Sequence, residues 1–410
     1  MNKNWKKQFI TIYAGQAFSL LGSAAVQFAV IWWLTVQTGS AVTLTIASVV
    51  SFIPNMIVGP FAGVWIDRLN RRTVMIAADG VVALSSVILG AAFLRTDEPP
   101  VWFIYMILLL RGLGNTFHGP ALQATIPTLV PAGMLVKAGG WGNLITSVSN
   151  MLGPVLGAAL MGLLPIAGIM LVDIFGALFA IACLLFVKIP DISSGASTAH
   201  LLSDMKEGFG AMRQNKPLIA AFGPMMLMTI LYMPLGALFP LLVRAHFMGE
   251  AWHNSIVEFA FAGGLLLSSL VIGVWGGMKN RFLMAALAIG LLGAGSFVGG
   301  ALPSGGYWIF VVCCFFMGAS GTFMNVPVMA YVQESTPPEM MGKVFSLMMS
   351  AMTLAMPIGL IIAGPVSETV GVNNWFFWSG AALMLTGILF RMLTRPYDSQ
   401  TRLPQAKADG

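Results

Sequence analysis

The chain has 410 residues, of which 57% are hydrophobic and only 9% are charged, and its formal net charge is +6. Soluble proteins contain roughly 25% charged residues, and 36 charged side chains cannot cover the water-exposed surface of a chain this long. This composition excludes soluble enzymes, nucleic-acid-binding proteins and secreted domains, and it predicts a protein that crosses a membrane many times.

Twelve apolar stretches follow one another along the chain, and each is long enough to cross about 30 Å of hydrocarbon as a helix. Their hydrophobic residues do not alternate every second position, which argues against a membrane β-barrel. The boundary between the fifth and sixth stretches depends on Leu164-Pro165. The predicted spans are residues 9–36, 42–66, 73–94, 100–122, 138–163, 165–187, 217–243, 254–278, 281–302, 306–330, 342–369 and 374–394.

Lysine and arginine are distributed unevenly between the two sides of the predicted membrane. Eighteen of the 21 lie on one side, Arg95 and Arg244 lie on the other, and Arg111 lies inside the fourth span. Cytoplasmic loops carry an excess of basic residues. We therefore expect both termini to be cytoplasmic, which agrees with an even number of spans.

Two sequence patterns occur twice. Residues 63–71 and 273–281 both read GVW followed by NR, and residues 112–137 and 318–343 share G, TF, P, M and K at the same spacings. Each copy occupies the same place in its half of the chain. The fold class predicted is therefore an all-α integral membrane protein with two pseudo-symmetric six-helix bundles. Parallel repeats of this kind are a transporter architecture, with the substrate site between the halves.

The longest connection between spans follows the sixth span and separates the two halves. It has a flexible first part and a short amphipathic second part, which we expect to lie on the inner membrane surface. We predict an N-terminal bundle at residues 1–187, a cytoplasmic linker at 188–216, a C-terminal bundle at 217–394 and a cytoplasmic tail at 395–410.

Two local motifs resemble signatures of the major facilitator superfamily. The loop after the second span, GVWIDRLNRR from Gly63 to Arg72, resembles the loop between helices two and three of that superfamily. The run SNMLGPVLG, from Ser149 to Gly157, is similar to the fifth-helix signature of its proton-coupled drug antiporters. Further similarity to the bacterial macrolide-efflux branch covers nearly the whole chain, including residues 15–16, 32–33, 38–40, 111–118, 337–340 and 344–346.

The first candidate site is the loop after the second span, which the resemblance implies helps to close the cytoplasmic side of the transporter. A carboxylate beside three arginines would stay ionised and could bind a neighbouring helix end. Asn70 stands where the family prefers glycine, and asparagine can still take the positive φ of a tight turn. The alternative is that the arginines only satisfy the positive-inside bias. The residues of this gate loop are Gly63, Asp67, Arg68, Asn70, Arg71 and Arg72.

Arg111 is the second candidate site. Inserting an arginine at the centre of a membrane helix costs at least about 2.5 kcal/mol of free energy, so its presence there calls for a specific role. We expect it to face the bundle interior and to pair with an acid. The resemblance implies a role in proton coupling, and a structural ion pair between helices is the alternative.

Three intramembrane acids are candidate proton sites, because desolvation makes a buried carboxylate easier to protonate. We rank Asp173 first, since it lies about 12 Å below the external surface if its helix starts at Pro165. Asp79 could instead pair with the gate loop or with Arg111. Glu258 could simply be hydrated at the membrane surface.

The fifth span contains Gly153, Pro154 and Gly157, which remove a backbone donor and permit close helix contact. The resemblance places the packing partner in the other half of the chain, and a packing-only role is the alternative. His118 is expected to be a hydrogen-bonded interior histidine in preference to a proton carrier. Polar or aromatic residues within the spans that could line a substrate cavity are Gln16, Gln27, Trp32, His118, Tyr232 and Asn325.

The sequence contains no nucleotide-binding loop, no HExxH motif and no cysteine and histidine cluster, so we expect no enzyme activity, no cofactor and no metal. The leading hypothesis is multidrug or macrolide export, in which a lipophilic, cationic, drug-like compound leaves the cell through alternating access driven by the proton-motive force. The alternative is a transporter of the same fold for a physiological solute such as a siderophore or a metabolite. We expect a monomer in the bacterial inner membrane that does not bind nucleic acid and requires no separate ATPase, although an ATPase partner is left open.

Overall fold

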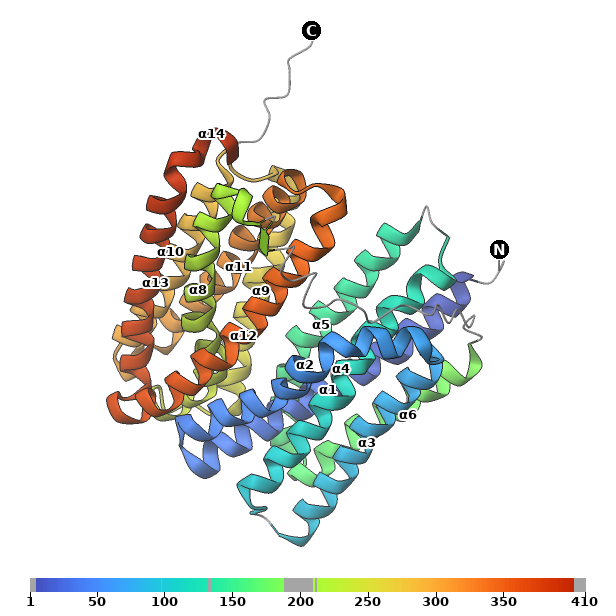
Figure 1. Cartoon of the computed structure of the whole chain (residues 1–410). Coiled ribbons are helices and arrows are strands. Elements are labelled where there is room, and N and C mark those ends of the chain that lie inside the picture. The colour runs from blue at the N-terminus through green and yellow to red at the C-terminus, as the bar shows by residue number, and fades with distance from the viewer. Residues whose placement is uncertain (1–4, 97, 132–133, 188–208, 211, 402–410) are drawn as a thin grey trace. The chain divides into compact units, whose positions relative to one another are not determined.

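The structure is a computed structural model that describes residues 5–96, 98–131, 134–187, 209–210 and 212–401. Within these ranges the chain forms helices joined by short connections (Figure 1). The twelve long helices of the described part are α1 (Trp5–Thr38), α2 (Ala41–Arg68), α3 (Arg71–Arg95), α4 (Val101–Leu129), α5 (Leu135–Leu163), α6 (Ile166–Phe186), α8 (Lys216–Leu241), α9 (Ala251–Trp275), α10 (Arg281–Ala301), α11 (Tyr307–Ser335), α12 (Pro338–Val370) and α13 (Val372–Thr394). The shorter elements are η2 (Leu242–His246), η3 (Ser304–Gly306), η4 (Arg395–Tyr397) and α14 (Asp398–Thr401).

The long helices have the length and composition that a bilayer requires. The shortest, α6 and α10, have 21 residues each, which at 1.5 Å per residue is enough to cross about 30 Å of hydrocarbon. Eleven helices of the described ranges are long and apolar enough to span a membrane, and α4, which carries Arg111, is the remaining long helix. The predicted all-helical fold is confirmed for the described residues, with twelve long helices of which eleven meet the criteria of length and composition for a membrane span.

Asparagine side chains determine where three helices begin. Asn70, Asn215 and Asn280 each accept a hydrogen bond from the backbone N–H three residues further along, at 3.3, 3.2 and 3.0 Å. Such caps satisfy one of the free N–H groups of the first helical turn. Asn70 has φ −64°, so it does not adopt the positive φ that the family's glycine suggested. Its side chain instead caps α3, as Asn280 caps α10 in the repeated motif.

The break between α5 and α6 falls where the sequence predicted it. α5 ends at Leu163, and Pro165 is the residue before the first residue of α6. Leu164 is extended, with φ −129° and ψ 149°, as expected for a residue that precedes proline. The separation of these two spans is therefore confirmed.

The contacts divide the chain into two compact units, made mainly of α1 to α6 and of α8 to α13. In Figure 1 the first runs from blue to green and the second from yellow-green to red. In the first unit α1 packs against α5 and α6, and α3 packs against α4 and α6. In the second unit α8 packs against α12 and α13, and α10 packs against α11 and α13. Counted within each half, these are the same helix pairs, so the pseudo-symmetry predicted from the repeats is confirmed.

Two parts of the predicted organisation lie largely outside the described residues. The predicted linker at 188–216 is described only at its end, and the tail is described only to Thr401. The described start of the tail is held by Arg391, whose guanidinium donates to both carboxylate oxygens of Asp398 at 2.6 and 2.7 Å.

Candidate functional site

Arg111 and Asp173 form a buried ion pair between α4 and α6. Arg111 Nη1 lies 2.6 Å from Asp173 Oδ2, and the two side chains are 5% and 0% exposed. Ser86 of α3 donates to Oδ2 and Ser23 of α1 donates to Oδ1, each at 2.6 Å. The carboxylate therefore accepts three short hydrogen bonds, one of them from a cation, which stabilises it as an anion.

The guanidinium of Arg111 is also satisfied by its surroundings. Its Nη1 atom donates to Ser86 Oγ at 2.7 Å and reaches Ser85 Oγ at 3.5 Å. Its Nη2 atom donates to the backbone carbonyl of Ser23 at 3.4 Å. These contacts offset the cost of an arginine at this depth, and they tie four helices of the first unit together at one level.

Asp79 of α3 occupies a second polar cluster with much weaker contacts. Gln16 Nε2 and Ser19 Oγ, both on α1, each donate to its carboxylate at 3.4 Å. His118 Nε2 of α4 lies 3.5 Å from Asp79 Oδ1, and it makes no hydrogen bond of good geometry among the described residues. Asp79 is only 4% exposed. It is thus a buried acid whose described contacts are all long.

The two clusters are separated by two helical turns. Asp79 and Ser86 are seven residues apart on α3, and Arg111 and His118 are seven residues apart on α4. Seven residues correspond to about 10.5 Å along a helix and return to nearly the same face. The first unit therefore contains two polar layers, one above the other along the same helix faces. One layer contains Asp173, which has short contacts, and the other contains Asp79, which has long contacts.

Other residues singled out in the sequence lie elsewhere. Gln27 is half-buried and Trp32 is buried on α1, but neither contacts the two acids by a hydrogen bond in the described structure. Tyr232 of α8 stacks on Phe261 of α9, with ring centroids 6.4 Å apart. The second unit also contains half-buried Glu258 on α9 and exposed Asn325 on α11. Of the residues predicted to line a substrate cavity, only Gln16 and His118 contact one of the two buried acids in the described structure, and that acid is Asp79.

Three serines complete the polar layers and were not identified from the sequence. Ser19 and Ser23 lie on α1, and Ser86 lies on α3. A signal was present in the spacing, because Gln16, Ser19 and Ser23 follow one another at intervals of three and four and therefore share one helix face. An uncharged serine in an apolar helix is common, so this stripe becomes informative only beside Asp79 and Asp173.

The gate loop joins the start of α3 to two other helices of its unit. Arg71 donates to the backbone carbonyl of Ala124 in α4, and Arg72 donates to that of Leu185 in α6, both at 2.6 Å. Basic groups are favourable near the carbonyl ends of helices. The side chains of Asp67 and Arg68, and any contact at Gly63, lie outside the described residues.

The glycines of the fifth-helix motif allow α5 to approach α1. A Cβ added at Gly153 would clash with Ala24, and one added at Gly157 would lie 2.7 Å from the carbonyl oxygen of Ala25. These described contacts are with α1 of the same unit, and a partner in the other half stays a prediction. The two glycines are four residues apart, so they present one continuous small face to one neighbouring helix.

Replacing Gly157 by valine is expected to destabilise the first unit by about 1–3 kcal/mol, the usual cost of overpacking a filled interface. The added Cβ meets backbone, which cannot rotate away. Thermal unfolding of the purified protein in detergent measures the effect. Gly162→Val is the matched control, because a Cβ at Gly162 on the same helix meets nothing within 4 Å. Equal melting temperatures for the two variants would contradict the predicted contact.

Comparisons with known proteins agree with this architecture. The sequence profile of the Major Facilitator Superfamily matches residues 12–252 and 235–409. Macrolide efflux protein A of Streptococcus pyogenes is 39% identical over 393 residues, which are 95% of this chain and 96% of that protein. Macrolide efflux protein A of Enterococcus faecalis is 38% identical over 325 residues, which are 78% of this chain and 100% of that protein.

Solved structures share the fold at low sequence identity. A bacterial homolog of the human lysosomal transporter Spinster has a TM-score of 0.73 at 10% identity and covers 99% of this chain and 100% of that chain. A bacterial homologue of the iron transporter ferroportin has a TM-score of 0.73 at 16% identity, with coverage of 96% and 100%. The family match, the macrolide efflux relatives and the two repeated bundles of long apolar helices together point to a multi-pass membrane transporter. The chain belongs to the major facilitator superfamily.

Proposed function

We propose that the protein exports macrolides or similar lipophilic, cationic compounds from the bacterial cytoplasm, driven by inward proton flow through alternating access. The observation that carries this proposal is Asp79, a buried acid with long contacts inside a chain 39% identical to a macrolide efflux protein. A buried carboxyl group that exchanges a proton is the simplest device for coupling transport to the proton gradient.

Asp79 is a better proton carrier than Asp173 on the geometry of the two sites. Protonating Asp173 would end its ion pair with Arg111 and would remove the negative charge that strengthens three hydrogen bonds of 2.6 Å. Protonating Asp79 weakens only contacts of 3.4–3.5 Å with Gln16, Ser19 and His118. The proposal therefore reverses the ranking made from depth in the membrane alone.

The two polar layers have different roles in this proposal. The Arg111–Asp173 pair holds α4 and α6 together and stays charged throughout the cycle. Asp79 gains and loses a proton, so its interaction with α1 and with His118 on α4 changes in strength during the cycle. A change of charge beside three packed helices supplies the differential interaction that a shift between two conformations requires. Glu258 is not needed for this step.

The same proposal includes the arrangement in the cell. Both termini lie in the cytoplasm, as the basic loops indicate, and the protein works as a monomer in the inner membrane without a cofactor or an ATPase. The gate loop from Gly63 to Arg72 helps to close the cytoplasmic side.

The test is the accumulation of labelled erythromycin in an efflux-deficient bacterium that expresses the chain, with and without a protonophore. Low accumulation that the protonophore restores to the level of cells without the protein supports energised export. Unchanged accumulation, with the protein present in the membrane, would exclude the macrolide assignment and favour a physiological solute such as a siderophore or a metabolite.

A further inference from the structure

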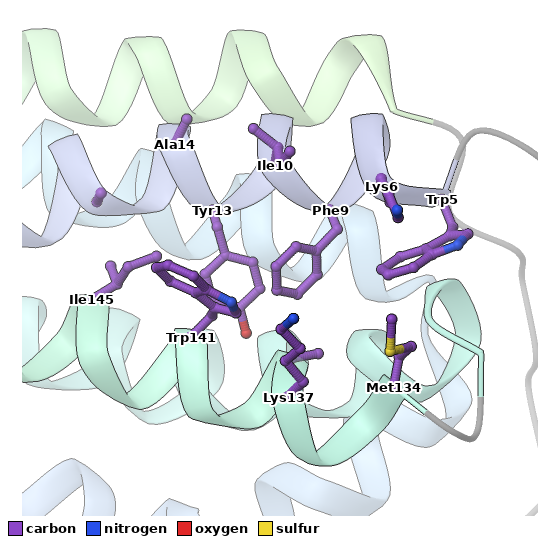
Figure 2. A pocket seen from close by; sticks show the side chains of 12 residues that line it. Trp5, Lys6, Phe9, Ile10, Tyr13, Ala14, Met134, Lys137, Trp141 and Ile145 are labelled. Carbon is purple, nitrogen blue, oxygen red and sulfur yellow. The ribbon is translucent and has the colours of Figure 1, made fainter.

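A cavity of about 530 Å³ lies between the first turns of α1 and α5. Figure 2 shows the rings of Phe9 and Tyr13 pointing from α1 towards α5, and the ring of Trp141 pointing back from α5. Phe9 and Tyr13 are in ring contact, with centroids 4.4 Å apart. Gly142 has no side chain to displace the Tyr13 hydroxyl. The walls of this α1–α5 cavity are therefore almost wholly apolar.

Two lysines, one on each helix, line the α1–α5 cavity. Lys6 of α1 and Lys137 of α5 are both exposed and both line it. Lys6 Nζ lies 5.9 Å from the centre of the Trp5 ring. Within the described part of the chain neither lysine forms an ion pair, and the described lining residues include no acid. The α1–α5 cavity thus combines an otherwise apolar lining with two positive charges, one on each helix.

This combination fits one class of ligand. A cationic macrolide would meet two like charges in this cavity, and such juxtaposition is unfavourable. A neutral apolar molecule would leave the lysines without a partner. An acyl chain in the aromatic interior with a phosphate group beside the lysines satisfies both parts, and basic pockets between helices on the cytoplasmic side of a membrane bind anionic headgroups.

We propose that the α1–α5 cavity is a binding site for an anionic phospholipid of the cytoplasmic leaflet. The phosphate group lies between Lys6 and Lys137, and one acyl chain lies against Phe9, Tyr13 and Trp141. The choice of leaflet rests on the proposed orientation, in which the basic start of α1 is cytoplasmic. The lipid site itself depends neither on the exported solute nor on proton coupling.

Native mass spectrometry of the purified full-length protein tests the site with phosphatidylglycerol and phosphatidylethanolamine of identical acyl chains. We expect phosphatidylglycerol to bind at least about fivefold more tightly, a difference of roughly 1 kcal/mol. The double variant Lys6→Gln/Lys137→Gln should bind both lipids equally. The matched control Lys216→Gln/Lys279→Gln removes two exposed lysines of the second unit and should keep the preference.

A third variant tests the apolar part of the α1–α5 cavity. Ala14→Trp places an indole inside the cavity while both lysines remain, so it should weaken phosphatidylglycerol binding as well. Thermal unfolding identifies any variant that fails to fold. Equal binding of the two lipids by the unmodified protein, or full binding by Ala14→Trp, would overturn the site. Displacement of the lipid by erythromycin, with tighter erythromycin binding after the lysine replacements, would also overturn it. Because binding is measured without transport, failure here leaves the export proposal intact.

Discussion

Replacing Asp79 by asparagine is expected to abolish export driven by a proton gradient while leaving the fold intact. Asparagine has nearly the same size and keeps a carbonyl oxygen towards Gln16 and Ser19, but it cannot exchange a proton. Only contacts of 3.4–3.5 Å are altered, so stability should change little. In proteoliposomes with an imposed pH gradient we expect the export rate to fall about tenfold or more, a change worth at least about 1.4 kcal/mol in the rate-limiting barrier.

Two measurements separate loss of coupling from loss of the protein. Exchange of labelled for unlabelled substrate without a gradient should survive in Asp79→Asn, since it requires no net proton movement. Ser19→Ala is the matched control, because it removes one weak donor to the same carboxylate and leaves the proton site in place. Gradient-driven export at the unmodified rate by Asp79→Asn would show that the proton binds elsewhere.

Most of the fold could be predicted from the sequence because only a few kinds of secondary structure are stable inside a bilayer. Every backbone polar group must be paired within the membrane, so each long apolar stretch has to be a helix. The helix ends were less predictable, since they depend on local contacts. α1 begins at Trp5 and α4 continues to Leu129, both beyond the predicted spans. Those extra turns project past the apolar stretch, where hydropathy gives no signal.

The charged residues of the candidate site could be predicted from the sequence, but the uncharged side chains that surround them could not. Arg111 was expected to face the interior and pair with an acid, and Asp173 is that acid. The sequence ranked Asp173 as the proton site because it is deep, but depth does not reveal how many donors surround a carboxylate. Those donors are serines on α1 and α3, brought together only by packing of distant segments. Asp79 differs from Asp173 because its contacts are 3.4–3.5 Å long, whereas those of Asp173 are 2.6 Å.

Replacing Arg111 alone by methionine is expected to destabilise the first unit strongly. It leaves the Asp173 carboxylate, 0% exposed, without its cation. Breaking a buried ion pair by removing one partner costs about 3–5 kcal/mol. We therefore expect strongly reduced amounts in the membrane and a lower melting temperature in detergent. The double variant Arg111→Met/Asp173→Leu removes both charges together, and replacing a buried pair by apolar groups of similar volume is often neutral.

The double variant also distinguishes the two roles considered for this pair. Ser23 and Ser86 lose their acceptor in it, but serines inside helices can donate to a carbonyl of their own preceding turn, so the folded unit should persist. If the pair is structural, the folded double variant still exports substrate with a proton gradient, because Asp79 and His118 are untouched. If Asp173 carries the proton, the double variant folds and exchanges substrate but shows no gradient-driven export. Gradient-driven export by the double variant, together with its loss in Asp79→Asn, would place the coupling proton at α3.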